Sequence, residues 1–453
     1  MELGFETIGN ATLIVHDREP VLVTDPWFEG DAYFGSWRLS HEVPEEQVAA
    51  IEAARFCWVS HGHPDHLSLA SLRRLRGAVI LMPDHVGGRI ASALRSDGFD
   101  VRVMADRTWV NLSARVRVCS IADYNQDAVL LVDVGGRLVM NVNDSTDHGW
   151  RRFVRTAAEQ YDISFLLQLS GFGSSDMINV VDEEGMRIPS LVDERVPPGI
   201  ELSRSARRLG ARYVIPFSSM HRYQRADSVW ANEHVAGLDD YGRGFDSTAS
   251  ELLPPFIRYD CIRDSVSLID PAERQGRTRE PAEFGDDWSE PLETEDRQHL
   301  DSYLRRVAHL GEGFEFIGFE VGGSTHRIEF PGRRGRASIT FAAPRTSLMT
   351  AVRNEVFDDL LIGNFMRTIV HGAADSSVLY PHFTPYLCKY ADNGGARSRA
   401  EVAEYLRAYR HRAPFDYLRH RLERMAVDRV RGLLPVGSPA YRLARRAYRG
   451  SAI

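Results

Sequence analysis

The sequence predicts an α/β protein in which layers of strands and helices stack on one another. Three observations lead to this prediction. Short apolar runs bounded by Gly, Pro and Asp indicate strands, and they alternate with stretches of helical periodicity. This alternation is typical of layered α/β domains. The chain has 453 residues, of which 43% are hydrophobic, so it can form a sizeable core and is too long for one ordinary domain.

The individual elements can be assigned in order along the first half of the chain. A helix is expected at 44–54, because Pro44 opens it and its apolar residues share one face. A second helix is expected at 87–98. The apolar runs that indicate strands lie at 9–15, 21–27, 55–59, 78–82, 101–104, 114–121, 128–134, 136–144, 163–168 and 212–217.

The most informative stretch lies between the strand at 55–59 and a helical run at 67–75. It contains four residues of metal-binding type, namely His61, His63, Asp65 and His66. Neutral imidazoles and carboxylates suit Zn²⁺, Fe²⁺ or Mn²⁺. The first two histidines are two residues apart on an extended backbone and point to the same side, whereas the last two residues turn toward a neighbouring position. This division predicts two metal ions close together.

The pattern His-x-His-x-Asp-His resembles the signature of the metallo-β-lactamase superfamily. The strands at 9–15 and 21–27 look like that family's first strands, and the second ends in Asp25, which supports the metal site in the family. The resemblance implies an αββα sandwich. We therefore expect this sandwich in the first part of the chain and a second, smaller α+β domain at the C-terminal end.

A narrower resemblance covers the segments 25–37 and 60–72. Both are similar to the corresponding segments of the CMP-N-acetylneuraminate hydroxylases, an oxygenase branch of the superfamily. The likeness extends to about residue 225. It implies a di-iron centre that uses O₂ as a co-substrate.

The superfamily resemblance also implies two further metal ligands. Asp144 ends the strand at 136–144, where the superfamily places the aspartate that bridges the two metals. The alternative is a simple cap at the strand end. His221 follows the strand at 212–217, where the last metal-binding histidine is placed, and the alternative there is a histidine that faces solvent.

A third histidine, which the superfamily usually has near residues 122–127, is missing from this sequence. Asp123 is the nearest candidate to replace it, and Asp127 is the second. A carboxylate at this position favours iron over zinc, and an acidic residue also occurs there in lactamase-fold di-iron hydroxylases of antibiotic biosynthesis. The alternative for either residue is an aspartate that caps a turn.

The composition shifts after the predicted catalytic half. Residues 271–297 are rich in Pro, Glu, Asp, Arg and Gly, which is typical of a linker. We therefore expect a catalytic domain at 1–265, a polar linker at 266–298 and an α+β domain at 299–453. Within the last domain, the alternating runs between 314 and 342 predict an antiparallel meander, and residues 415–447 predict a pair of amphipathic helices.

Charge, cysteines and hydropathy narrow the class of function. The net charge of −8 gives no support for a nucleic-acid partner. No apolar run approaches the roughly 20 residues of a membrane span, and the first residues lack a basic, apolar leader. The four cysteines form no Cys-x-x-Cys pair or disulfide framework, which favours a reducing cytoplasm. Nothing in the sequence indicates an oligomeric state.

These observations lead to two hypotheses of function. The favoured one is an oxygenase with two divalent metal ions, preferably iron, that hydroxylates or oxidises a small-molecule or nucleotide-linked biosynthetic intermediate. The residues expected to carry the chemistry are His61, His63, Asp65, His66 and Asp144. The related hydroxylases carry a Rieske cluster on Cys-x-His and Cys-x-x-His pairs, which this sequence lacks, so a separate electron-transfer protein is expected.

The alternative hypothesis is a hydrolase. The same ligands could hold two zinc or manganese ions, which would lower the pKa of a bound water and so generate hydroxide near neutral pH. The substrate would then be an ester, lactone, amide or phosphodiester.

Overall fold

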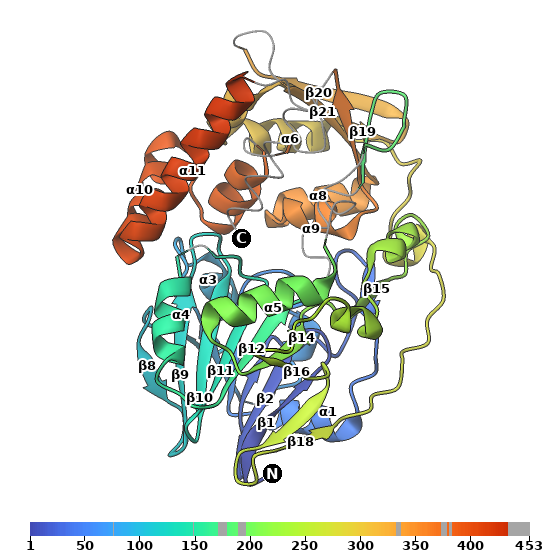
Figure 1. Cartoon of the computed structure of the whole chain (residues 1–453). Helices are drawn as coiled ribbons and strands as arrows, with labels where there is room; N and C mark the ends of the chain where they lie inside the picture. Colours follow the sequence, from blue (N-terminus) through green and yellow to red (C-terminus); the bar gives the residue numbers. More distant parts are fainter. Residues whose placement is uncertain are drawn as a thin grey trace. The chain divides into compact units, whose positions relative to one another are not determined.

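A computed structural model describes residues 1–75, 77–147, 149–170, 179–188, 196–331, 337–372, 378–379 and 383–433. The chain forms two compact units (Figure 1). The first comprises Met1–Ser175, Arg195–Phe284 and Ile362–Asn364, and the second comprises Asp176–Glu194, Gly285–Leu361 and Phe365–Ile453. Helix α6 begins at Thr294, inside the segment expected to be a linker.

The first unit contains two large sheets. The larger sheet has the strand order β18-β17-β1-β2-β3-β5-β6-β7. Its strands β3, β5, β6 and β7 run parallel to one another, whereas the others pair antiparallel. The bounds are β1 (Leu3–Ile8), β2 (Thr12–Asp17), β3 (Glu19–Thr24), β5 (Phe56–Trp58), β6 (Val79–Met82), β7 (Val101–Val103), β17 (Ile257–Asp260) and β18 (Ser265–Leu268).

The second sheet of this unit has the order β16-β14-β12-β11-β10-β9-β8. Strands β11, β12 and β14 are parallel neighbours. The bounds are β8 (Trp109–Asn111), β9 (Val116–Ala122), β10 (Ala128–Val134), β11 (Arg137–Asn143), β12 (Ser164–Leu169), β14 (Tyr213–Phe217) and β16 (Glu251–Leu252). A separate pair, β4 (Trp37–Leu39) and β15 (His221–Tyr223), runs antiparallel.

The apolar side chains show how the two sheets are layered. Leu13 of β2 and Leu130 of β10 belong to one buried cluster that both sheets supply. Their neighbours Ile14 and Leu131 belong to another cluster, which includes residues of the helices. Because successive strand residues point to opposite faces, the central strands bury one face against the other sheet and the other face under helices. This is why β2 and β10 are continuous apolar runs.

Two contacts confirm that the sheets pack face to face. Phe5 of β1 packs edge-to-face on Phe165 of β12, with ring centroids 4.9 Å apart. The indole N–H of Trp58 on β5 donates to the hydroxyl of Ser120 on β9 over 3.2 Å. The two sheets are therefore the inner layers of an αββα sandwich, and the predicted fold class is confirmed.

Helices form the outer layers of the first unit. In Figure 1, α4 and α5 lie across the sheet that contains β11 and β12. Helix α5 ends at Gly210, whose φ of 73° is a left-handed conformation that glycine adopts readily at a helix end. The bounds are α1 (Glu45–Glu52), α2 (Leu69–Leu72), α3 (Arg89–Ser96), α4 (Arg151–Ala158) and α5 (Pro198–Leu209), with 3₁₀ turns at Val229–His234, Leu238–Gly242 and Pro281–Phe284.

The second unit is built on a five-stranded sheet in the order β13-β22-β21-β19-β20. The expected meander is wrong in one respect, because β21 pairs with β19 in parallel rather than with β20. The bounds are β13 (Val180–Val181), β19 (Phe314–Val321), β20 (Ser324–Glu329), β21 (Ala337–Ala342), β22 (Arg367–His371), α6 (Thr294–Arg305), α7 (Leu310–Gly313), α8 (Arg345–Asn354), α9 (Phe357–Gly363), a π-helix (Pro385–Asn393), α10 (Arg399–Arg412) and α11 (Pro414–Leu433).

The terminal helical pair is described only in part, because α11 ends at Leu433 and residues 434–453 lie outside the described residues. In the part of the chain that the structure describes, no helix combines the length and apolar character that a membrane crossing requires. All four cysteines are buried free thiols.

The inter-sheet core provides a test of the fold. Leu130→Ala should lower the free energy of unfolding by about 2–5 kcal/mol, because it leaves a cavity between the two sheets. The matched control is Leu268→Ala on β18, whose side chain is 69% exposed and which should change stability by less than about 0.5 kcal/mol. Urea unfolding followed by tryptophan fluorescence reports mainly on the first unit, because only Trp288 lies in the second. Equal effects of the two substitutions would contradict this core assignment.

Candidate metal centre

The candidate ligands all lie where strands of the sandwich end. The segment His61–His66 follows β5, Asp144 follows β11, and His221 comes after β14 at the start of β15. The carboxyl ends of parallel strands in α/β sheets are where ligands and catalytic groups collect. Three segments far apart in the sequence therefore contribute to one region of the first unit.

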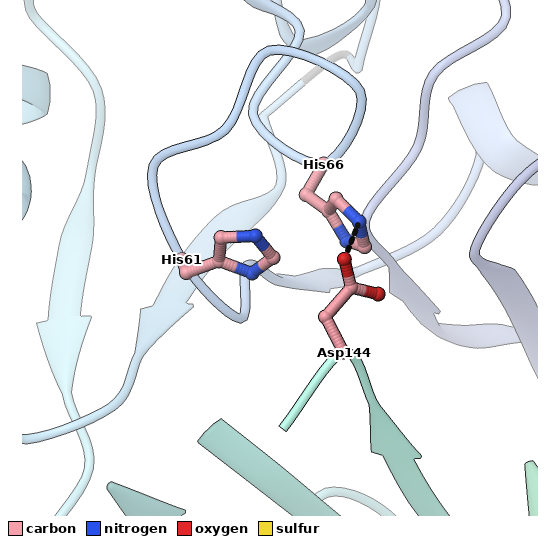
Figure 2. A group of neighbouring side chains, drawn as sticks. All are labelled: His61, His66 and Asp144. Atoms are coloured by element: carbon pink, nitrogen blue, oxygen red, sulfur yellow. Dashed lines mark ion pairs between the residues drawn. The ribbon is translucent and has the colours of Figure 1, made fainter. Parts of the chain in front are cut away.

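Three of the candidate ligands meet directly. One ligand atom from each of His61, His66 and Asp144 lies within 4.8 Å of the others, and Figure 2 shows the three side chains pointing toward one another. The Nε2 atom of His66 is 3.5 Å from Oδ2 of Asp144. His63 joins them, because its Nδ1 lies 2.8 Å from Nε2 of His61.

Asp65 approaches the same nitrogen of His66 as Asp144 does. Its Oδ2 is 3.3 Å from Nε2 of His66 and accepts a hydrogen bond from the amide of Asn10 over 2.9 Å. Its Oδ1 accepts a hydrogen bond from the hydroxyl of Tyr33 over 2.5 Å. The carboxylate of Asp65 is buried. Two neutral donors and one imidazole orient it.

His221 is the most informative of the candidate ligands. Its side chain is buried, and neither ring nitrogen has a hydrogen-bond partner among the described residues. The ring stacks on the indole of Trp37, with centroids 3.5 Å apart and planes at 2°. A buried polar group without a partner costs about 1–3 kcal/mol. A metal cation would satisfy an imidazole nitrogen of His221 that no described hydrogen-bonding group contacts. The environment of His221 therefore fits a bound metal ion.

The two candidates for the missing third histidine are placed differently. The Oδ1 atom of Asp123 accepts hydrogen bonds from the backbone N–H groups of Asn125 and Asp127, and its Oδ2 accepts one from the Ser145 hydroxyl. By contrast, Oδ1 of Asp127 lies 4.0 Å from Nδ1 of His61. The carboxylate of Asp123 thus supports the loop, whereas that of Asp127 lies beside a candidate ligand. Ligation by Asp123 stays a prediction.

Asp25 holds the histidine loop in place. Its Oδ1 accepts from the backbone N–H of Ser60 over 2.7 Å, and its Oδ2 accepts from the Ser60 hydroxyl over 2.8 Å. The same Oδ2 lies 3.2 Å from Nδ1 of His66 and accepts from the amide of Asn143 over 2.5 Å. Because Asn143 ends β11, this one carboxylate connects the two sheets.

Backbone strain is concentrated at the same point. Asp25, Asn143 and Ser218 have φ values of 42°, 51° and 58°, a left-handed conformation that is uncommon for residues other than glycine. Each of the three directly follows or ends a strand of the sandwich. Such strained residues cluster at functional sites, where the surrounding contacts enforce them.

The electrostatics of the centre favour a cation. Burial opposes a charge on His66, but the carboxylates of Asp65 and Asp144 outweigh it and raise the pKa of His66 well above its usual value. Burial would likewise raise the pKa of Asp65, but His66 and the Tyr33 hydroxyl lower it. The cluster therefore stabilises a positive charge near His66. A metal ion supplies that charge when it replaces the proton on the His66 ring.

The other two buried histidines are held neutral. Burial, with His66 and His63 as further causes, lowers the pKa of His61 well below its usual value. Burial lowers the pKa of His221 to about 3. A metal ligand must be a neutral imidazole, so both rings are in the state that ligation requires.

Sequence reasoning missed the residues that orient the ligands. Asn10 donates to Asp65 and accepts from the backbone N–H of Met220 over 2.8 Å, so it connects the ligand loop to the segment before His221. The Ser218 hydroxyl donates to Asp144. The only available signal was position, because each of these polar residues lies at the end of an apolar run.

Comparison with known proteins adds a sequence relationship. No protein-family description matches the chain. The cytidine monophosphate-N-acetylneuraminic acid hydroxylase of Danio rerio is 27% identical over 154 residues, which cover 32% of this chain and 26% of that protein. The chain thus matches about a quarter of the length of this relative, and the match agrees with the resemblance in the histidine motif.

Two solved structures are similar to part of the chain. The isothiocyanate hydrolase from Delia radicum gut bacteria is 15% identical, with a TM-score of 0.37, over 59% of this chain and 99% of that one. The diiron β-hydroxylase CmlA from Streptomyces venezuelae is 14% identical, with a TM-score of 0.34, over 59% of this chain and 54% of that one.

The role of Asp25 can be tested through metal content. Asp25→Ala removes the acceptor that orients His66 and the Ser60 turn, so we expect metal affinity to fall about 10–100-fold. The measurement is metal bound per chain after dialysis against a graded series of chelator concentrations. Asp97→Ala, at an exposed helix end, is the matched control and should bind metal as the wild type does. Wild-type affinity in Asp25→Ala would contradict the role.

Proposed function

We propose that this chain, which has the metallo-β-lactamase fold, is a dinuclear-iron oxygenase. It would hydroxylate or oxidise a small-molecule or nucleotide-linked biosynthetic intermediate. The observation that carries the proposal is that carboxylates, and not the superfamily's usual third histidine, lie beside His61: Oδ1 of Asp127 is 4.0 Å from Nδ1 of His61, the ring nitrogen that also contacts the Ser60 hydroxyl. A carboxylate that ligates there would make the ligand set richer in oxygen, and oxygen donors shift preference from zinc toward iron.

The donors divide into two similar sets. One ion would be held by His61, His63 and the carboxylate of Asp123 or Asp127, and the other by a second set, with Asp144 available to both. The second set is Asp65, His66 and His221. Two imidazoles and one carboxylate, with remaining positions open, are typical of the non-haem iron sites that use dioxygen. Each half of the proposed centre has this composition.

The sequence relationship supports the same class of reaction. The matched segment of the Danio rerio protein belongs to an enzyme named as a hydroxylase. Since only about a quarter of that protein is matched, we carry over the reaction class and leave its substrate aside.

The chain's own residues would prepare the centre for this chemistry. Two bound iron ions would supply the capacity to activate dioxygen. Asn10 and Tyr33 fix the direction of the Asp65 carboxylate, and the Ser218 hydroxyl fixes that of Asp144. The stacked ring of Trp37 keeps water from one face of His221. Ligands held in this way need little rearrangement when metal binds.

The electrons would come from a separate protein. Reductive activation of dioxygen needs an external electron source, and the four cysteines are buried free thiols. None of the four is followed by the histidine spacing of a Rieske cluster. We therefore propose that an electron-transfer protein reduces the centre.

Metal content and oxygen uptake together test the proposal. Protein purified without chelator should hold two irons per chain and consume oxygen only when a chemical reductant is added. His63→Ala should abolish the uptake and leave the far-UV circular dichroism unchanged, because His63 is half-buried at the loop surface. Colourless protein that holds zinc, takes up no oxygen and cleaves model esters or phosphodiesters would overturn the proposal in favour of the hydrolase.

A matched pair of substitutions separates the two candidate carboxylates. Asp127→Asn removes the charge beside His61, so we expect iron affinity to fall about 10–100-fold. Asp123→Asn keeps an oxygen that can accept from the two backbone N–H groups, so most of the metal should remain bound. Mössbauer spectra of both variants give the iron content and the similarity of the two sites. Loss of iron in Asp123→Asn alone would reverse the assignment.

A further inference from the structure

A cleft of about 310 Å³ opens beside the candidate metal centre in the first unit. The loop after β11, including Asp144, forms one wall, and the ends of β12 and α4 form another. Helix α5 supplies Ser205 and Arg208. Because these two residues are three apart on a helix, they share one face. The cleft therefore joins a candidate bridging carboxylate to polar side chains that the metal centre does not use.

Arg208 is the cation in this cleft that lacks an ion-pair partner among the described residues. Its guanidinium is half-buried and forms no ion pair with any residue that the structure describes, and its one hydrogen bond goes to the backbone oxygen of Arg204. Burial, and next the charge of Arg151, lowers the pKa of Arg208. Holding a cation in partial burial beside a second cation is unfavourable unless an anion approaches it.

The other charges around the cleft are already committed or exposed. Arg151 pairs with Asp147, with Nε 3.0 Å from Oδ2. Asp144 faces His66 at the candidate metal centre. Glu201 lines the cleft and is exposed. With Asp147 paired to Arg151 and Asp144 directed to His66, the guanidinium of Arg208 is left as the positive charge in the cleft without an ion pair to a described residue.

We propose that this cleft binds the anionic group, a carboxylate or a phosphate, of the molecule that reacts at the adjacent metal centre. The reaction at the metal centre rests on the proposed function, whereas binding of the anion in this cleft does not depend on it. Arg208 would form paired charge-assisted hydrogen bonds with the anion, and the hydroxyl of Ser205 and the amide of Gln168 line the same cleft. Binding the anionic end here places the rest of the molecule next to Asp144.

Inorganic phosphate is the probe that tests this site without turnover. We would titrate sodium phosphate into metal-loaded protein and follow the melting temperature, with sodium chloride adjusted to keep ionic strength constant. A ligand that binds the native state raises the melting temperature in a saturable way. In the wild type we expect saturation, and in Arg208→Gln we expect the apparent affinity to fall about tenfold or more, as for the loss of a charged hydrogen bond.

Two further variants make the result specific. Arg207→Gln removes a neighbouring arginine of α5 that pairs with Asp246 at the surface, so phosphate should bind it as it binds the wild type. Arg208→Lys keeps the positive charge but loses the two parallel hydrogen bonds of a guanidinium. Its affinity for phosphate should therefore lie between those of the wild type and Arg208→Gln. The melting temperatures in chloride alone check that all variants are folded.

The outcomes separate this proposal from the proposed function. Phosphate binding that survives in Arg208→Gln would mean that the metals or another surface hold the anion, and it would overturn the proposal. So would the absence of saturation in the wild type. Since neither readout involves oxygen, failure of reductant-dependent oxygen uptake would leave this result standing. Repeating the titration with acetate and with malonate distinguishes a carboxylate preference from a phosphate preference.

Discussion

The carboxylate of Asp25 is the constraint on which the rest of the centre depends. It is fully buried, and burial raises its pKa, so it needs several donors around it. Ser60 provides two of these, and Asn143 provides another from the opposite sheet. His66 lies against the same oxygen. The requirement to satisfy one buried acid thus fixes the histidine loop relative to β11, and it accounts for the strained backbone at both ends of this contact.

Once the two sheets are joined in this way, the remaining charges require a cation. Asp65 and Asp144 approach the same nitrogen of His66 within 3.3 and 3.5 Å. Like charges held that close in a buried site repel each other unless positive charge lies between them. The raised pKa of His66, which these carboxylates cause, and the unpartnered nitrogens of His221 both fit a site that binds a cation.

Much of this centre could be predicted because its ligands are local or lie at strand ends. The motif from His61 to His66 is contiguous, and Asp144 and His221 follow apolar runs, so position identified them. Contacts between distant segments were not readable, and for this reason the role of Asn10 was missed. The choice between Asp123 and Asp127 stays open, because both lie in one short loop and the sequence does not fix their contacts.

Helix α5 was missed for a different reason. Part of its buried face is made of small residues, since a side chain at Gly199 would meet the backbone oxygen of Arg243 at 2.5 Å, and small residues give no apolar periodicity. The parallel pairing of β21 with β19 was hidden because strand direction is set by the crossover rather than by local pattern.

The position of the unpaired arginine also bears on the choice between oxidation and hydrolysis. A phosphodiester hydrolase must present its anionic group to the metals, because that group is the one that reacts. An anion held by Arg208, in a cleft that shares its wall from Asn143 to Ser145 with the centre, would instead be a recognition group. The atom that reacts would then be a separate part of the molecule. Anionic recognition away from the metals would therefore disfavour a phosphodiester substrate, and it is compatible with hydroxylation of a carbon as well as with cleavage of an ester, lactone or amide.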